Sequence, residues 1–415
     1  MTAASPLRAY GAVTAAYWAF MLSDGALRML VLLHFNALGF SPVQLAWLFL
    51  LYEVAGIVTN LAAGWLAARF GLAATLYGGL ALQIGTLLAL GQLDPGWSIA
   101  ASVGFVMAVQ GVSGVAKDLA KMSSKSAVKL LAPSEDGGLF RWVAALTGSK
   151  NAVKGLGFFL GAALLGLAGF QAAVWGMAAV LAAILLAVIL FLPKGLPGRM
   201  KSAESWGGWR SRDPRVNRLS LARMFLFGAR DVWFVVGIPV YFQSVLSDGT
   251  PDGRREAFFL VGGFMALWII AYGAVQAFAP RILGGKAQPE AVVVRKAILW
   301  AGLLVPIPFA LALAALIAGG PAPWLTVLLV AGLLLFGFVF AVNSSVHSYL
   351  ILAFGDASRI TRDVGFYYMA NAAGRLIGTL LSGLSYQAGG LPLCLTTAGI
   401  MALASWWAAR RLGDI

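Results

Sequence analysis

The sequence is poor in charge, cysteine and histidine. Only 11% of its 415 residues are charged and 60% are hydrophobic, whereas a soluble domain carries about 25% charged residues. The single cysteine, Cys394, excludes an internal disulfide and a cysteine-based metal cluster. The two histidines, His34 and His347, lie far apart, so we interpret them as satisfied polar residues and not as metal ligands.

Sequence motifs of catalysis are also missing. We find no HExxH metal motif, no phosphate-binding loop ending in Gly-Lys-Ser or Gly-Lys-Thr, and no sizeable soluble domain. These absences argue against an enzyme, a bound cofactor and ATP hydrolysis by this chain. The net charge of +14 would suit a nucleic acid, but the basic residues lie in loops between apolar segments, as in membrane proteins. We therefore expect a membrane protein with no nucleic-acid partner.

Twelve apolar windows run along the chain, each near the length that crosses about 30 Å of hydrocarbon as a helix. They cover residues 10–33, 43–67, 70–91, 97–116, 143–168, 170–192, 219–245, 257–279, 297–319, 323–346, 364–388 and 390–409. Helices are favoured because the backbone must satisfy its own hydrogen bonds in lipid and no barrel-type alternation occurs. The sequence predicts an all-α membrane protein with twelve transmembrane helices.

The basic residues predict the orientation of these helices. With the chain starting inside, 22 of the 30 lysines and arginines fall in inner segments, and two, Arg254 and Arg255, fall in an outer loop. Cytoplasmic loops are rich in lysine and arginine. Both termini are therefore predicted to be cytoplasmic, in a bacterial inner membrane.

A basic linker at 193–218 divides the chain into two six-helix halves, 1–192 and 219–415. Internal similarity supports this division. Three residues of the first predicted helix recur in the seventh with a constant offset of 207 residues: Phe20, Asp24 and Phe35 correspond to Phe227, Asp231 and Phe242. We expect two pseudo-symmetric halves.

Charged residues inside the predicted spans carry the main functional signal. The cations are Arg28, Lys150, Lys154, Arg223, Arg230 and Arg375, and the acids are Asp24, Glu53 and Asp231. Each charge facing lipid would cost roughly 2.5–3.5 kcal/mol. Even if every acid neutralises one cation, three cations remain, so the core is expected to bind an anion.

Spacing limits how these charges pair. Asp24 and Arg28 are four residues apart with the acid first, which favours a pair on one helix face. Arg230 and Asp231 are adjacent and point about 100° apart, so they are not expected to neutralise each other. Two alternatives remain open: Arg223 could extend to the headgroups, and Lys150 could lie at a shallow helix end.

Two repeated patterns have simpler interpretations. A lysine recurs at every fourth position and predicts a basic stripe that faces lipid headgroups, although its first members could attract anions to the inner mouth; the stripe is Lys117, Lys121, Lys125 and Lys129. Gly157–Gly161 and Gly374–Gly378 have the GxxxG spacing of helix-packing faces.

Twelve spans in two halves with a basic central loop resemble the major facilitator superfamily. The segment Gly64-Trp-Leu-Ala-Ala68-Arg69-Phe-Gly71 is similar to the family's loop motif of Gly, Asp, Arg and Gly, but Ala68 replaces its acid. Gln110-Gly111 matches the end of another family motif, in which Met107 replaces the usual arginine. The gating salt bridge and the proton-coupling role of those two motifs are therefore not carried over.

Longer segments resemble one branch, the organoarsenical efflux permeases encoded beside arsenic-resistance genes. They include Tyr17-Trp-Ala-Phe, Ser-Asp24-Gly-Ala-Leu-Arg28, Gly114-Val-Ala-Lys117, Thr147-Gly-Ser-Lys150-Asn-Ala-Val-Lys154-Gly and Phe227-Gly-Ala-Arg230-Asp-Val-Trp-Phe. The resemblance implies export of 1-arseno-3-phosphoglycerate, which a cytosolic glyceraldehyde-3-phosphate dehydrogenase makes from arsenate. It further implies arsenate resistance, because the exported ester falls apart outside the cell.

The predicted substrate site lies between the two halves, near the membrane midplane. Arg28 and Arg230 are expected to clamp the anion, because arginine binds forked oxygens with two donors. Further contacts are expected from Lys150, Lys154, Arg375, Asn151, Asn371, Tyr17, Arg223 and Lys117. Asp24 and Asp231 would hold the arginines in the empty state, and Glu53 would be the coupling proton site because a carboxyl in low dielectric has a raised pKa.

Two rival functions remain open. A phosphate-ester or organic-anion exchanger of the same fold would need the same surplus of cations. A membrane-embedded enzyme or receptor is the more distant alternative. The expected partners of the predicted exporter are the lipid bilayer and a small anion, and the chain is expected to be a monomer.

Overall fold

The computed structural model describes residues 6–131, 138–192, 211, 213–284, 289–354 and 360–413. Within these ranges, it describes the backbone but not the side chains of residues 6–8, 63–68, 125–126, 128–131, 138–148 and 360–362. The predicted linker 193–218 therefore lies mostly outside the described residues, as do the side chains of Ala68, Lys125 and Lys129.

The described residues form helices joined by short turns, with no strand among them. In chain order the helices are α1 (Pro6–Ala37), α2 (Pro42–Leu48), α3 (Leu50–Leu90), α4 (Ile99–Leu131), α5 (Gly138–Phe191), α6 (Pro214–Val232), the π-helical turn η1 (Trp233–Gly237), α7 (Ile238–Leu246), α8 (Pro251–Ile282), α9 (Glu290–Leu304), α10 (Pro306–Ala318), α11 (Pro323–Phe354) and α12 (Ile360–Arg410). The chain is thus an all-helical protein over the part described.

Glycines with non-helical backbone angles interrupt the three longest helices. Gly71 of α3 has φ 73° and ψ 179°, and Gly169 of α5 has φ 78° and ψ 175°. In α12 the break lies at Gly389 and Gly390, where Gly390 has φ 60°. Only glycine adopts these angles without strain. The breaks at Gly169 and Gly389 fall between neighbouring predicted windows, whereas Gly71 is the second residue of the window 70–91.

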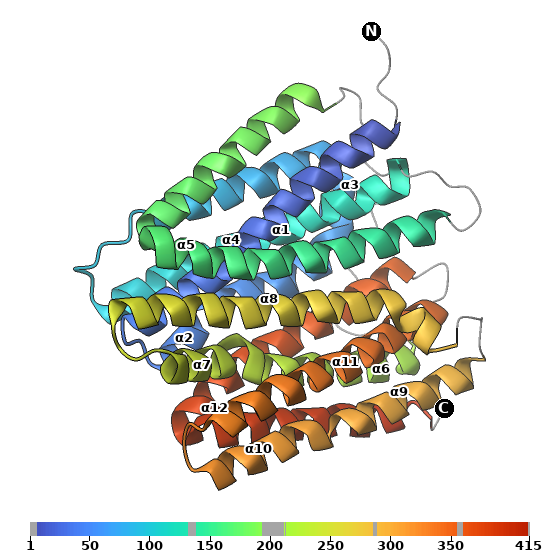
Figure 1. Cartoon of the computed structure of the whole chain (residues 1–415). Helices are drawn as coiled ribbons and strands as arrows, with labels where there is room; N and C mark the ends of the chain where they lie inside the picture. The colour runs from blue at the N-terminus through green and yellow to red at the C-terminus, as the bar shows by residue number, and fades with distance from the viewer. Residues whose placement is uncertain are drawn as a thin grey trace.

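The break in α5 changes the direction of the chain. A straight helix of its 54 residues would be about 80 Å long at 1.5 Å per residue, far more than a bilayer needs. Figure 1 shows α5 as two limbs that meet at a corner. The sequence places Gly169 where the limbs must separate.

Ten helical segments among the described residues are long and apolar enough to cross a membrane. Two of them, Ser149–Phe191 and Asp363–Arg410, contain the breaks at Gly169 and Gly389–Gly390. The long helices lie roughly side by side in one bundle (Figure 1), and α1 begins at the same side of the bundle as α12 ends. The protein is therefore a multi-pass membrane protein.

Glycines allow close helix contact along the junction of α5 with α8. A methyl group added at Gly155 would lie 2.9 Å from the carbonyl oxygen of Ala266, and one at Gly262 would overlap Ala162. Figure 1 shows α5 and α8 running beside each other across the middle of the bundle. In a membrane such small-residue contacts replace the hydrophobic drive that water would supply.

A second junction joins α2 and α3 to α12. A methyl group at Gly383 of α12 would lie 2.5 Å from the carbonyl oxygen of Pro42, at the start of α2. Further along, a methyl group at Gly56 of α3 would lie 3.7 Å from Ala372 of α12. The two junctions connect helices from before residue 192 with helices from after residue 213.

Both GxxxG segments are helix-packing faces, which confirms the prediction. A side chain at Gly161 of α5 would overlap the carbonyl oxygen of Ala26 in α1. A side chain at Gly374 of α12 would overlap the carbonyl oxygen of Met224 in α6. These contacts fix the distance between the helices that carry Lys154 and Asp24, and between those that carry Arg375 and Asp231.

We predict that Gly161→Ala destabilises the folded protein, because the new methyl group cannot be accommodated without moving α1 from α5. The cost should be about 1–3 kcal/mol, as for other overpacked interiors, seen as a lower melting temperature of the purified protein in detergent. Gly176→Ala is the matched control, since nothing lies within 4 Å of a methyl group there. Equal melting temperatures for the two variants would contradict this account of the α1–α5 contact.

Candidate functional site

Five charged side chains form a continuous chain through the core, which we call the central ion-pair chain. Arg28 and Arg375 both contact Oε1 of Glu53, at 3.0 and 2.5 Å. The Nε of Arg375 lies 3.5 Å from Oδ2 of Asp231. Arg230 completes the chain by contacting Oδ1 of Asp231 at 2.5 Å. The order is Arg28, Glu53, Arg375, Asp231 and Arg230.

The central ion-pair chain joins helices that are distant in the sequence. Arg28 lies on α1, Glu53 on α3, Asp231 on α6 and Arg375 on α12. The two acids are 1–2% exposed, whereas the three arginine side chains are 11–18% exposed. The carboxylates are thus sealed inside while each guanidinium keeps a small accessible surface, so an anion could approach the cations and not the acids.

Asp24 forms a second ion pair beside this chain. Its Oδ2 lies 2.7 Å from Nζ of Lys154 on α5, and its Oδ1 accepts a hydrogen bond of 2.6 Å from the hydroxyl of Tyr52. The spacing of Asp24 and Arg28 predicted a pair on one helix, but their partners lie on other helices. The packing of α1 against α3 brings Glu53 to Arg28, and its packing against α5 brings Lys154 to Asp24. Spacing along one helix cannot predict such contacts between helices.

Arg230 and Asp231 are paired, so the prediction that they do not neutralise each other is wrong. The long guanidinium side chain folds back across the helix surface and spans the 100° between adjacent positions. The π-helical turn η1 begins two residues later, at Trp233. The freed amide groups of Val236 and Gly237 donate to the hydroxyl of Ser382 on α12. The backbone irregularity beside Asp231 is thus satisfied by the helix that carries Arg375.

Aromatic rings cover the cations. The ring of Tyr52 lies 4.2 Å from Nζ of Lys117 and 5.3 Å from the guanidinium carbon of Arg28. The ring of Phe227 lies 4.8 Å from the guanidinium carbon of Arg230. Cation–π attraction stabilises desolvated cations, and it leaves their hydrogen-bond donors available to a ligand.

Arg223 is buried by other means. Its side chain is not extended to the surface: the residue is 5% exposed. It donates to the carbonyl and hydroxyl oxygens of Ser344 at 2.9 and 3.0 Å, and to Oδ1 of Asn371 at 3.3 Å. Its guanidinium stacks on Phe227 at 4.2 Å and on Tyr367 at 4.9 Å. Arg223 therefore belongs to the core polar groups and not to the membrane surface.

The remaining predicted contacts lie around these groups. Asn151 donates to Oε1 of Gln276 at 3.0 Å, and Gln276 donates to the hydroxyl of Ser344 at 3.3 Å, which connects α5 to Arg223. Lys150 is half-buried beside Asn151. Tyr17 is 2% exposed and lies within electrostatic range of Asp24.

Sequence reasoning missed two further buried acids, Asp363, which is 4% exposed, and Asp118. Asp118 lies beside the helices of the central ion-pair chain. Its exposed fraction is 2%, and it accepts hydrogen bonds from Thr59 and, at 3.5 Å, from Lys121. Lys121 also donates to Asn60 at 2.8 Å. The apolar window ended at residue 116, whereas α4 continues to Leu131, so Asp118 was not counted among the charges within the predicted spans. The neighbouring lysines, Lys117 and Lys121, were the sequence feature that could have indicated a paired acid at position 118.

The histidines differ from each other. His34 stacks on Phe170 with ring centroids 4.2 Å apart. His347 is fully buried, and neither ring nitrogen has a hydrogen-bond partner, so its interpretation as a satisfied polar residue is wrong. No group of three potential metal ligands occurs among the residues described.

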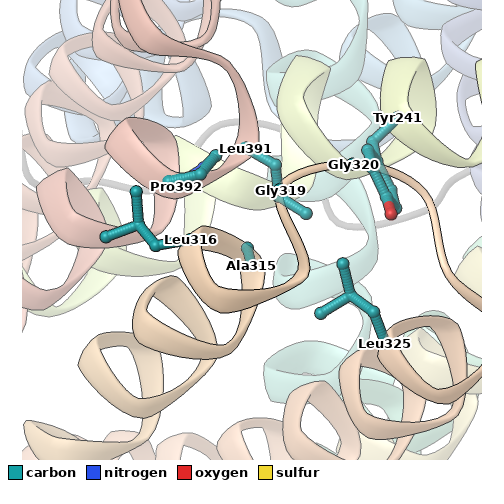
Figure 2. Close-up of a pocket in the computed structure, with 8 residues that line it drawn as sticks. All are labelled: Tyr241, Ala315, Leu316, Gly319, Gly320, Leu325, Leu391 and Pro392. Carbon is teal, nitrogen blue, oxygen red and sulfur yellow. The ribbon is translucent and has the colours of Figure 1, made fainter.

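A pocket of about 340 Å³ lies away from these charges, at one end of the later helices. Tyr241, Gly319, Leu325 and Leu391 are among its eight lining residues, which are all uncharged (Figure 2). It therefore has none of the chemistry that the central ion-pair chain offers an anion.

A bundle of membrane-crossing helices around buried, paired charges is typical of a membrane transporter. Residues 13–357 match the Major Facilitator Superfamily, and the chain belongs to that family of transporters. No curated protein matches it in sequence.

Solved structures of transporters share the fold. The nucleoside transporter NupG, in a mutant form, is 17% identical with a TM-score of 0.70, covering 97% of this chain and 98% of its own. A bacterial homologue of the iron transporter ferroportin, in an inward-facing state, is 13% identical with a TM-score of 0.72, covering 99% and 100%. A POT family transporter in complex with a thioalcohol-conjugated peptide is 16% identical with a TM-score of 0.71, covering 98% and 96%. At these identities the likeness concerns the fold alone.

We predict that Glu53→Gln strongly destabilises the protein, because Arg28 and Arg375 would lose their shared carboxylate. Leaving a buried charge without its partner costs about 3–5 kcal/mol, which thermal unfolding in detergent would detect. Glu290→Gln is the control: Glu290 contacts Arg215 at 3.1 Å with 42% of its side chain exposed, and an exposed pair contributes at most about 1 kcal/mol. If the Glu53 variant were no less stable than the Glu290 variant, the shared ion pair would not stabilise the core.

Proposed function

We propose that the protein is an exporter of a small organic anion that works by alternating access. The observation that carries this proposal is the charge balance of the core. Arg28, Lys150, Lys154, Arg223, Arg230 and Arg375 outnumber Asp24, Glu53 and Asp231 by three. Adding Lys117 and Lys121 together with the two further buried acids, Asp118 and Asp363, leaves the surplus unchanged. A surplus of buried cations is unfavourable unless an anionic ligand neutralises it.

We further propose twelve spans, with both termini in the cytoplasm of a bacterium. Dividing the long segments at Gly169 and Gly389–Gly390 turns the ten candidate spans into twelve. The basic residues of the even-to-odd connections then face the inner side of the membrane.

Two pseudo-symmetric halves, 1–192 and 219–415, would enclose the site. Corresponding contacts support them: Asp24 and Asp231, which are 207 residues apart, contact Lys154 on α5 and Arg375 on α12. Asn36 donates to Gln243 at 2.6 Å, and these two residues are themselves 207 apart. A residue that touches its own counterpart must lie close to the pseudo-two-fold axis.

In this mechanism the anion binds between the halves, and Arg28 and Arg230 are its principal clamps. Lys150, Lys154 and Arg375 add charge, and Asp24 and Asp231 hold their cationic partners while the site is empty. The Glu53–Arg375 contact joins the halves, so it must break when they separate. Release of an arginine from Glu53 would be the step at which a proton enters the cycle.

The resemblance to organoarsenical permeases supports 1-arseno-3-phosphoglycerate as cargo. This molecule presents forked anionic oxygens, which suit bidentate arginine. A cytosolic glyceraldehyde-3-phosphate dehydrogenase would then be the functional partner, the exporter would act as a monomer, and export would give arsenate resistance.

The test is arsenate resistance in cells that express the dehydrogenase together with the transporter. We expect Arg230→Gln to abolish the resistance, because the anion loses a charge-assisted fork worth about 1.5–3 kcal/mol. Arg254→Gln, on the exposed first turn of α8, should keep full resistance at equal expression.

Full resistance with Arg230→Gln would contradict the role of this arginine. If the wild-type chain gave no resistance but moved labelled phosphate ester in vesicles, the cargo would be a different organic anion, as in the exchanger alternative.

A further inference from the structure

The uncharged pocket of Figure 2 lies where several helices reach the same end of the bundle. It is lined by Tyr241 of α7, by Gly319 and Gly320 in the turn after α10, by Leu325 on the first turn of α11, and by Leu391 beside the break in α12. Figure 1 shows the α10–α11 turn at the end of the bundle that is remote from the start of α1. Since these helices are long enough to cross the hydrocarbon, the pocket lies at the depth where hydrocarbon gives way to headgroups.

The mouth of this pocket faces the bilayer. Leu316 lines the pocket although 62% of it is exposed, and the next residue, Ile317, is 72% exposed. Trp324, at the start of α11, is 49% exposed, and tryptophan is enriched at the membrane interface. A methyl group added at Gly319 or Gly320 would meet no atom within 4 Å. A lipid chain can therefore enter between the exposed side of α10 and the turn that follows it.

The walls of the pocket combine apolar side chains with one buried hydroxyl group. The volume of about 340 Å³ lies within the range of about 300–1,000 Å³ that is typical of ligand pockets. Tyr241 is 7% exposed, and its hydroxyl has no hydrogen-bond partner among the described residues. Figure 2 shows the hydroxyl oxygen at the end of the ring that lies toward Leu325. Because a buried hydroxyl without a partner is unfavourable, an occupant that supplies an acceptor would bind more tightly than a purely apolar one.

We propose that the pocket binds one acyl chain of a membrane phospholipid, whose ester carbonyl accepts a hydrogen bond from the hydroxyl of Tyr241. The ester carbonyls of a phospholipid lie between its hydrocarbon and its headgroup, which is the depth of this pocket. The eight lining residues are uncharged, so the site recognises the acyl ester and not the charge of the headgroup. This lipid site is separate from the central ion-pair chain and does not depend on the proposed function.

The experiment titrates the delipidated full-length protein in detergent with dioctanoyl phosphatidylcholine and with its diether analogue, which lacks the carbonyl groups. Native mass spectrometry reports the affinity of the first bound lipid. The wild type should bind the ester lipid about fivefold more tightly, as one hydrogen bond allows. Tyr241→Phe should weaken only the ester lipid and reduce the ratio to about one. Tyr349→Phe, at a tyrosine of α11 that is 46% exposed, should keep the wild-type ratio.

Ala315→Phe tests the pocket itself, because the new ring would take the space of the acyl chain. This variant should bind both lipids at least about tenfold more weakly. Equal binding of the two lipids by the wild type, an unchanged ratio in Tyr241→Phe, or undiminished binding by Ala315→Phe would each overturn the inference. If Ala315→Phe does not fold, Ala315→Val replaces it, with an expected loss of about threefold for both lipids. None of these results would alter the proposed function, since no residue of the central ion-pair chain lines the pocket.

Discussion

The carboxylate of Glu53 accepts one arginine from α1 and another from α12, and much of the core is organised around this shared contact. One carboxylate oxygen lies within 3.0 Å of both guanidinium groups. Desolvating three charges is costly, and the arrangement is stable only while the partners stay together. It therefore holds α1, α3 and α12 in one geometry, and any separation of α3 from α12 must first release Arg375. The same contact that stabilises this state is the one that transport must break.

The other charges are arranged to make that release possible. Arg375 also lies near Asp231, so it keeps an acidic partner when its ion pair with Glu53 breaks. Glycines along the α5–α8 and α3–α12 junctions let the backbones approach without interlocking side chains, which favours sliding or rocking of whole helices. The aromatic rings over Arg28, Arg223 and Arg230 stabilise the cations without neutralising them. The core thus keeps an excess of positive charge, which an anionic cargo would balance.

The helical membrane fold was predictable because hydropathy reports it directly; the breaks at Gly169 and Gly389 fall between predicted windows, and Gly71 lies at the start of the window 70–91. The predicted cations Arg28, Lys154, Arg223, Arg230 and Arg375, and all three acids, lie in core ion pairs or hydrogen bonds. Their partners were not predictable, because each pair joins two different helices: Arg28 and Glu53 are 25 residues apart in the sequence, and Lys154 and Asp24 are 130 residues apart. Asp118 was missed because α4 extends beyond its apolar window. The unsatisfied His347 was missed because burial without a partner has no signature in sequence.

The central claim is that the cationic core moves an anion across the membrane. Current from proteoliposomes adsorbed on a solid support, recorded after a jump in phosphate-ester concentration, tests it most directly. The account predicts a saturable current with the sign of anion movement for 3-phosphoglycerate, and none for uncharged glycerol. No current with either compound, or the same current with both, would contradict it.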